Sequence, residues 1–160
     1  MHIRQALESD AAAIARIFNH AIETGIASWL PEPVSVSNRL NWIRTHAAFV
    51  AEEDGVVLGF AGFGPWKTSP AYRFTVEDSV YIGPEAAGKG VGFALMSTLI
   101  DVARSDGYRR MVASIEAGNE ASIALHRKCG FEPIGIMPGV GEKWGRELDL
   151  SVWMKRLTDL

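Results

Sequence analysis

The chain has 160 residues, of which 48% are hydrophobic and 22% are charged, and its formal net charge is -3 at pH 7. This length predicts a single domain over residues 1–160 that buries roughly 70% of its unfolded surface. The charge, without any run of Lys or Arg, argues against nucleic acid as a partner, and no stretch approaches the roughly 18 apolar residues of a membrane span.

Cysteine content and the N-terminus bear on the compartment. Cys129 is the only cysteine, which excludes an intrachain disulfide and a zinc site built from several cysteines. The N-terminus reads Met1-His2-Ile3-Arg4-Gln5, with polar residues where a signal peptide would need an apolar core. We therefore expect a cytoplasmic protein with no metal, nucleic acid or membrane among its partners.

The first third of the sequence predicts a strand followed by two helices. The strand is short and lies around Ile3. Apolar residues from Ile14 to Ile22 then recur at helical spacing, and Ser9 or Asp10 can cap the start of that helix. Ser35 offers a cap for a second, shorter helix that ends near His46.

The middle of the chain predicts three strands. A hairpin is expected over residues 49–63, because the turn signal Asp54-Gly55 separates two apolar stretches. Residues 73–82 then alternate between polar and apolar side chains, which is typical of a strand with one polar face.

The last part predicts helices alternating with strands. A glycine-rich turn leads into a helix that ends at Asp106-Gly107, and a second helix over residues 119–129 ends at Gly130. Strands are expected at residues 111–115, 134–136 and 148–154. The order is βααβββαβαββ, which indicates an α/β fold with a mixed, mostly antiparallel sheet and helices on both faces.

The turn at residues 88–92 has the geometry of a phosphate site, because glycines allow close backbone approach and N–H groups at a helix start face an anion. The Rossmann pattern fails, since Phe93 stands where its third glycine should be. The P-loop pattern fails at Gly90, where Ser or Thr should hold magnesium. A glycine-rich helix start without any ligand stays open at this point.

The wider pattern resembles the GCN5-related N-acetyltransferase (GNAT) superfamily. Residues 87–92 occupy its coenzyme motif R/Q-x-x-G-x-G/A, and residues 125–131 match its L-Y-x-x-x-G-F with His126 in place of tyrosine. The resemblance implies the GNAT acyl-CoA N-acyltransferase fold with acetyl-CoA as co-substrate. Ala87 replaces the usual Arg or Gln, so backbone amides and Lys89 would hold the pyrophosphate. The residues assigned to the coenzyme are Val80, Tyr81, Ile82, Gly88, Lys89, Gly90, Val91, Gly92, Phe93 and Asn119.

Within that superfamily the chain looks like the phosphinothricin and methionine sulfoximine N-acetyltransferase group. The most specific segments are Glu32-Pro33, residues 75–81, Leu125-His126 and residues 140–146. The resemblance implies direct acetyl transfer to the α-amine of a small amino acid such as L-methionine sulfoximine, methionine sulfone or phosphinothricin. It also implies a homodimer and a role in detoxification.

Acetyl transfer needs a neutral amine, so a base must take a proton from the ammonium group. Glu77 is our candidate, because it lies on the polar face of the expected strand and related enzymes carry a base there. Asp78 falls on the opposite face by alternation, although a bulge would exchange the two. Partial burial would raise the pKa of Glu77 toward the working range. A surface carboxylate without a role is the alternative.

The substrate's anionic group needs a cation. Arg73 lies on the same strand face as Glu77, so we expect both side chains to reach one pocket, where the guanidinium would bind that group. Phe74 and Thr75 beside it are further candidates for substrate contacts. Trp29 and Lys143 are candidates on family likeness alone, and they could equally be core and surface residues.

The thiolate leaving group needs a proton. His126 occupies the superfamily's general-acid position, and an ordinary histidine pKa of about 6.5 suits proton delivery. A histidine satisfied in the core is the alternative. Backbone N–H groups at residues 80–82 would polarise the thioester carbonyl. Cys129 could form an acetyl-cysteine, but a packed thiol is favoured because no base is evident nearby.

Two other functions stay open. One is a non-catalytic acyl-CoA-binding module, which the departure at Ala87 allows. The other is a GNAT enzyme whose acceptor is a polyamine, a peptide N-terminus or an aminoglycoside. The presence of Glu77 and His126 favours an enzyme, and the scattered acids with a modest net charge disfavour a strongly cationic acceptor.

Overall fold

The computed structural model describes residues 1–159, and its elements follow the order βααβββαβαββ, which confirms the predicted order. Three 3-10 turns, η1 (Glu8–Asp10), η2 (Pro70–Tyr72) and η3 (Pro84–Ala86), lie between the longer elements. The helices are α1 (Ala11–Thr24), α2 (Val36–Thr45), α3 (Val91–Ser105) and α4 (Glu120–Lys128). The strands are β1 (His2–Gln5), β2 (Ala47–Glu53), β3 (Val56–Pro65), β4 (Thr75–Ile82), β5 (Arg110–Glu116), β6 (Glu132–Lys143) and β7 (Arg146–Arg156).

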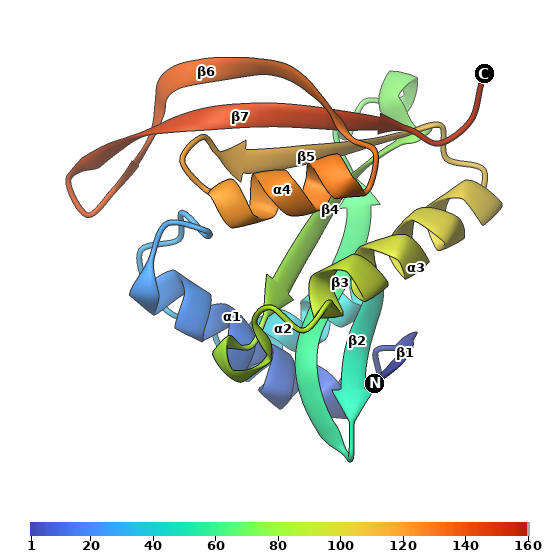
Figure 1. Cartoon of the computed structure of the whole chain (residues 1–160), viewed down its shortest axis with the longest axis vertical. Coiled ribbons are helices and arrows are strands. Elements are labelled where there is room, and N and C mark those ends of the chain that lie inside the picture. The colour runs from blue at the N-terminus through green and yellow to red at the C-terminus, as the bar shows by residue number, and fades with distance from the viewer. Residues whose placement is uncertain (160) are drawn as a thin grey trace.

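The strands form one sheet in the order β1-β2-β3-β4-β5-β7-β6 (Figure 1). Every neighbouring pair is antiparallel except β4 and β5, which are parallel. That parallel pair is short, because only Thr75–Glu77 pairs with residues 110–112. Beyond it the two strands separate, which opens the middle of the sheet.

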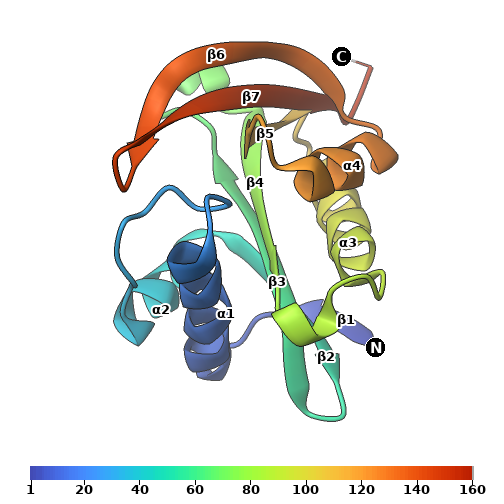
Figure 2. The same cartoon turned by 60° about the vertical axis from the view of Figure 1, so that its left-hand side comes forward.

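Helices cover both faces of the sheet, as the sequence predicts (Figure 2). One core lies between the sheet and α3, whose Leu95, Met96 and Leu99 are fully buried because they recur on one helical face. A second core on the opposite face joins α1 and α2 to β2 and β3 through Ile14, Phe18, Trp42, Val50 and Phe60. The opening between β4 and β5 therefore has helices on each side of it.

Most of the predicted caps and turns are confirmed. The Ser35 hydroxyl accepts a hydrogen bond from the Asn38 N–H at 3.0 Å and caps α2. Asp54 and Gly55 both have positive φ, as a tight hairpin between β2 and β3 requires. Asp10 precedes α1 but accepts from Leu7 N–H and pairs with Arg4. It therefore anchors η1 to β1 rather than capping α1.

The predicted strands near the C-terminus are too short. The expected strand at residues 134–136 lies near the start of β6 and the expected strand at residues 148–154 is the centre of β7, and the two strands have 12 and 11 residues. Register shifts interrupt their pairing between Pro133 and Gly135 and between Met137 and Gly141. Glycine and proline weaken the strand pattern there, so periodicity alone underestimates the hairpin.

The start of β4 also differs from the expectation. The strand begins at Thr75, whereas Arg73 ends the 3-10 turn η2 with φ -60° and ψ -19°.

Among residues 1–159 no helix combines the length and the apolar character that crossing a lipid bilayer requires.

Candidate active site

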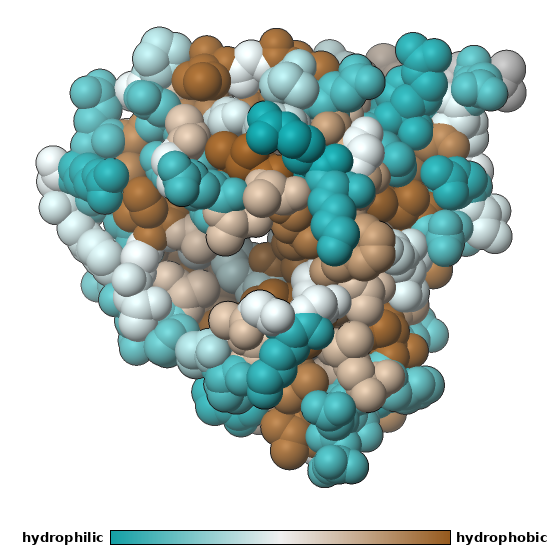
Figure 3. Space-filling model, in the orientation of Figure 1, coloured by the Kyte–Doolittle hydropathy of each residue, from teal (hydrophilic) through white to brown (hydrophobic). Residues whose placement is uncertain are grey.

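Two adjoining cavities occupy the opening between β4 and β5. From Asp78 onward β4 pairs with β3 only, so its other edge faces the opening without a strand partner. The space-filling view shows a hollow in the middle of this face, where Figure 1 places α1, α4 and the start of α3 around β4 (Figure 3). The two cavities adjoin, because they share five lining residues: Ala27, Val80, Tyr81, Asn119 and Ser122.

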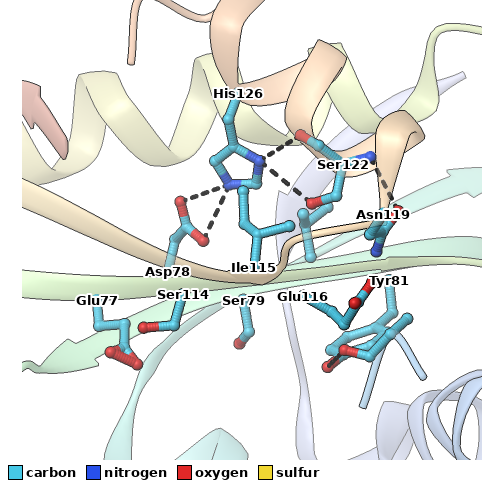
Figure 4. Close-up of a pocket in the computed structure, with 12 residues that line it drawn as sticks. Glu77, Asp78, Ser79, Tyr81, Ser114, Ile115, Glu116, Asn119, Ser122 and His126 are labelled. Atoms are coloured by element: carbon cyan, nitrogen blue, oxygen red, sulfur yellow. Dashed lines mark hydrogen bonds and ion pairs between the residues drawn. The ribbon is translucent and has the colours of Figure 1, made fainter. Parts of the chain in front are cut away.

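The first cavity has a volume of about 240 Å³ and is rich in carboxylates (Figure 4). Glu77, Asp78 and Glu116 all line it, together with His126. Glu77 and Ser114 point to one side of the splayed strands, whereas Asp78 points to the other side, toward His126 on α4. The remaining lining residues are Ser79, Ile115 and the five shared with the second cavity.

The second cavity has a volume of about 330 Å³ and runs along the glycine-rich turn. Gly88 and Gly90 have φ of 76° and 77°, a conformation that residues with a Cβ rarely adopt. Within residues 1–159 no hydrogen bond occupies the N–H groups of Gly88, Gly90, Val91 or Gly92, which lie at the N-terminus of the 15-residue helix α3. These donors and the helix dipole suit a pyrophosphate.

The coenzyme assignments made from the sequence fall into two groups. The structure brings most of them to the second cavity, which is lined by Val80, Tyr81, Ile82, Gly88, Gly90, Val91, Gly92 and Asn119. Ala87 lines it as well. Lys89 and Phe93 do not line it, and the exposed Phe93 ring instead lies 4.4 Å from the Lys128 ammonium. The helical turn of α3 carries Phe93 to the outer side of that helix.

Asn119 joins the two cavities at the start of α4. Its Oδ1 accepts from the Ser122 N–H at 3.2 Å and caps the helix. Its Nδ2 has no hydrogen-bond partner among residues 1–159, although the side chain lines both cavities. The amide can therefore donate to a bound ligand while it holds the helix.

Glu77 has the environment of a general base. Burial and the neighbouring Asp78 charge raise its pKa, and the opposing effects of Lys67 and a hydrogen bond to Ser114 are smaller. A carboxylate whose pKa is raised in this way takes up a proton more readily near neutral pH. The alternation across β4 also places Glu77 and Asp78 on opposite faces, as expected, with no register shift in the pairing of β4 with β3 or β5.

His126 lies against Asp78, a contact that the sequence did not reveal. Its Nε2 is 3.0 Å from Oδ2 and 3.2 Å from Oδ1 of Asp78, and its Nδ1 is 2.8 Å from the Ser122 carbonyl oxygen. Burial alone would lower the pKa of His126, but the hydrogen bond and charge of Asp78, with the Ser122 carbonyl, outweigh it and raise that pKa.

Glu116 and Ser114 are further lining residues that the sequence interpretation missed. Glu116 is 8% exposed, and its Oε2 accepts from the Gly118 N–H at 2.8 Å. A signal was present, since both polar residues alternate with apolar ones at the end of the strand at residues 110–116. Alternation of this kind puts their side chains on one face, here the face that carries Glu77.

Arg73 and Glu77 line different cavities, whereas the sequence predicts that they share one pocket. Arg73 is exposed, donates to the Pro70 carbonyl at 3.1 Å and stacks on Phe74. Arg73 and Thr75 line a third cavity of about 420 Å³, together with Lys67. The cause is the turn η2, which ends the chain's extended conformation before β4 begins.

Trp29 and Lys143 also line neither of the first two cavities. Lys143 is 2% exposed, and its Nζ donates at 2.7 Å to each of three carbonyl oxygens, those of Ile22, Gly25 and Ser28. Trp29 packs over Gly141, where a Cβ would collide with its ring. Both residues join the loop between α1 and α2 to β6. They therefore do not form the walls of the first two cavities that the sequence interpretation expects.

Cys129 and metal chemistry find no support at this site. The Cys129 thiol is 9% exposed, and burial and the Asp78 charge raise its pKa, which disfavours the nucleophilic thiolate. Among the described residues, no group of three His, Cys, Asp or Glu side chains is arranged to hold a metal ion.

The chain is similar to known acetyltransferases along nearly its whole length. Residues 14–131 match the sequence pattern described as the acetyltransferase (GNAT) family. The chain is 46% identical to the L-amino acid N-acyltransferase MnaT of Escherichia coli strain K12, covering 99% of this chain and 95% of the relative. It is 45% identical to the L-methionine sulfoximine/L-methionine sulfone acetyltransferase of Salmonella typhimurium, covering 99% and 96%.

A solved structure shows the same arrangement. The GNAT superfamily phosphinothricin acetyltransferase from Sinorhizobium meliloti, in complex with acetyl-CoA, superposes with a TM-score of 0.94 at 36% identity. The superposition covers 99% of this chain and 89% of that one. The predicted fold class is therefore confirmed.

Proposed function

This chain belongs to the acetyltransferase (GNAT) family, and from that premise we propose that it transfers the acetyl group of acetyl-CoA directly to the α-amine of a small amino acid. L-methionine sulfoximine, L-methionine sulfone and phosphinothricin are the acceptors that its relatives' names favour. The observation that carries the proposal is the junction of the two cavities. A coenzyme bound at the glycine turn would bring its thioester along Val80 and Tyr81 toward Glu77.

We assign the base to Glu77. The acceptor enters as an ammonium ion, Glu77 takes one proton, and the neutral amine attacks the thioester carbonyl. The unpaired edge of β4 supplies backbone N–H groups for the oxyanion that forms. The second nitrogen proton leaves during collapse, the C–S bond breaks and the thiolate takes a proton, so each turnover releases one proton to solvent.

The first cavity suits a small acceptor with a positive group. Its volume of about 240 Å³ has room for an amino acid, and Glu77, Asp78 and Glu116 supply three carboxylates against one histidine. This charge attracts the ammonium group of the acceptor. The acceptor's α-carboxylate needs a different contact.

We place that contact in the third cavity. Thr75, which lines the third cavity, lies two residues before Glu77 on the same face of β4, and Arg73 and Lys67 give that cavity positive charge. An Arg73→Gln variant should raise the acceptor KM and leave kcat nearly unchanged. An unchanged KM would remove Arg73 from acceptor binding.

We also propose a homodimer that pairs through β6. This strand is an edge of the sheet, and it exposes Ile134, Ile136, Met137 and Val140. Natural edge strands rarely leave such a row of apolar groups uncovered. Sedimentation velocity should give a dimer for the wild type and a monomer for Ile136→Lys, whereas a monomeric wild type would refute the pairing.

The cytoplasm remains the compartment that we propose, on the single cysteine.

Thiol release from acetyl-CoA, followed with a chromogenic reagent, tests the proposed reaction. The panel comprises L-methionine sulfoximine, L-methionine sulfone, phosphinothricin, spermidine and a short peptide. Release with the first three acceptors alone would establish the reaction and its acceptor class. Release only with spermidine or the peptide would contradict the assignment of a small amino acid.

A further inference from the structure

The hydrogen bonds of the His126 ring define where its protons are. A backbone carbonyl oxygen only accepts, so Nδ1, at 2.8 Å from the Ser122 oxygen, must carry a hydrogen. A carboxylate also accepts, so Nε2, at 3.0 Å from Asp78 Oδ2, carries the second hydrogen (Figure 4). The Ser122 hydroxyl is farther from Nδ1, at 3.4 Å, so the nearest partner of each ring nitrogen is an acceptor, which is the arrangement of an imidazolium ion.

The pair is closed off from bulk solvent. The side chains of His126 and Asp78 are 2% and 4% exposed, and the Phe131 ring meets the imidazole edge-on at 4.9 Å between centroids. A charge pair in such surroundings interacts more strongly than it would in water. Both side chains still line the first cavity, so a reacting group there meets the pair directly.

We propose, on the basis of the function proposed above, that Asp78 is a positioning residue which holds His126 doubly protonated, and that the two act as one proton-holding unit. The unit gives the proton shared between Nε2 and the Asp78 carboxylate to the thiolate sulfur as the C–S bond breaks. It is left as a neutral imidazole, whose Nδ1–H still donates to Ser122, beside the Asp78 carboxylate. A proton from the acceptor ammonium, passed through the first cavity, restores the imidazolium.

Asp78 also acts on the base. Glu77 is its neighbour in the sequence, and after burial the Asp78 charge is the largest cause of the raised pKa of Glu77. Of the titratable groups that line the first cavity with His126, Asp78 faces the ring, whereas Glu77 and Glu116 lie on the other side of the strands. Cys129 lies beside the Asp78 carboxylate, and Arg127 and Lys128 are exposed on α4 itself. One carboxylate therefore raises the pKa of the base by like charge and that of the acid by opposite charge.

NMR titration of the histidine rings tests the protonation state without any turnover. The His126 resonance is assigned by its loss in a His126→Gln variant. In the wild type we expect both ring nitrogens to remain protonated above an ordinary histidine pKa of about 6.5. In Asp78→Asn the titration should fall by about one pH unit or more. A wild-type His126 that titrates at or below the ordinary value would overturn the proposal even if no acceptor is ever found.

The pH dependence of kcat/KM supplies the second readout. Asp78→Asn should move both limbs of the profile to lower pH, because it removes a charge that raises both pKa values. Asp78→Glu, which keeps the charge, should restore the limbs at least partly. Asp101→Asn, an exposed change on α3, is the matched control and should leave the profile in place. Loss of rate in Asp78→Asn without movement of either limb would mean a purely structural role and refute the unit.

Discussion

Glu77 and Asp78 are consecutive residues that lie on opposite faces of β4, yet both line the same cavity. This is possible because β5 separates from β4 just after Glu77, so that the cavity is reached from both faces of the strand. The strand thus presents a base on the side of Ser114 and a carboxylate for His126 on the other side. The predictions that follow separate these roles.

Replacing the base should abolish turnover without loss of coenzyme binding. Glu77→Gln keeps the size of the side chain and removes its ability to take a proton, so we expect kcat to fall by about 10²-fold or more. Calorimetry should show acetyl-CoA binding unchanged. Glu132→Gln, on the exposed edge strand, is the matched control. Wild-type turnover in Glu77→Gln would remove Glu77 from the mechanism.

The raised pKa of Glu77 should appear in the acid limb of the rate profile. The base works only when it is ionised, so activity is lost as the pH falls through its pKa. Because burial and Asp78 raise that pKa, kcat/KM should begin to fall at a higher pH than the ordinary glutamate value of 4.5 allows. An acid limb at or below that value would show that Glu77 is not the titrating group.

The glycine turn should bind acetyl-CoA less tightly when one Cβ is added to it. Gly90→Ala forces a side chain into φ 77°, which costs about 1–2 kcal/mol, and it disturbs the N–H groups offered to the pyrophosphate. We expect a loss of acetyl-CoA affinity of about tenfold or more, measured by calorimetry. Gly107→Ala, at φ 89° and with nothing within 4 Å, imposes the same backbone strain at the other end of α3. Equal affinity losses in both variants would assign the effect to strain alone.

Lys143 should behave as a structural fastener. Its ammonium donates hydrogen bonds to three carbonyl oxygens. Lys143→Met leaves those acceptors buried without a donor, which should lower the free energy of unfolding by about 3 kcal/mol. Thermal unfolding should shift down by roughly 6–12 °C. Lys128→Met, which removes an exposed cation from Phe93, should shift it little. A Lys143→Met variant as stable as the wild type would contradict this role.

The sequence predicts the elements and the coenzyme turn well, because both depend on local patterns. The spacing of apolar residues in α1 and α3 and the glycines at 88 and 90 act within a few residues of themselves. Strand β6 was underestimated, since Pro133, Gly135 and Gly139 are poor strand formers that tertiary pairing with β7 overrides.

The cavity itself could be predicted only in part. The contact between His126 and Asp78 joins residues 48 apart in the sequence, and no periodicity within either element indicates it. Lys143 and Trp29 were misplaced for the same reason, because the loop between α1 and α2 meets β6 only in the folded chain. Arg73 differs from the expectation for a local reason, since the alternating pattern includes Arg73, which ends the 3-10 turn η2 before β4 begins.

Identification of the product tests the central claim most directly. L-methionine sulfoximine and acetyl-CoA are incubated with the enzyme, and the mixture is analysed by mass spectrometry and NMR. The account predicts free coenzyme A and N-acetyl-L-methionine sulfoximine in equal amounts, with the acetyl group on the α-nitrogen. Coenzyme A released without an acetylated amino acid would mean thioester hydrolysis and would contradict direct transfer to the amine.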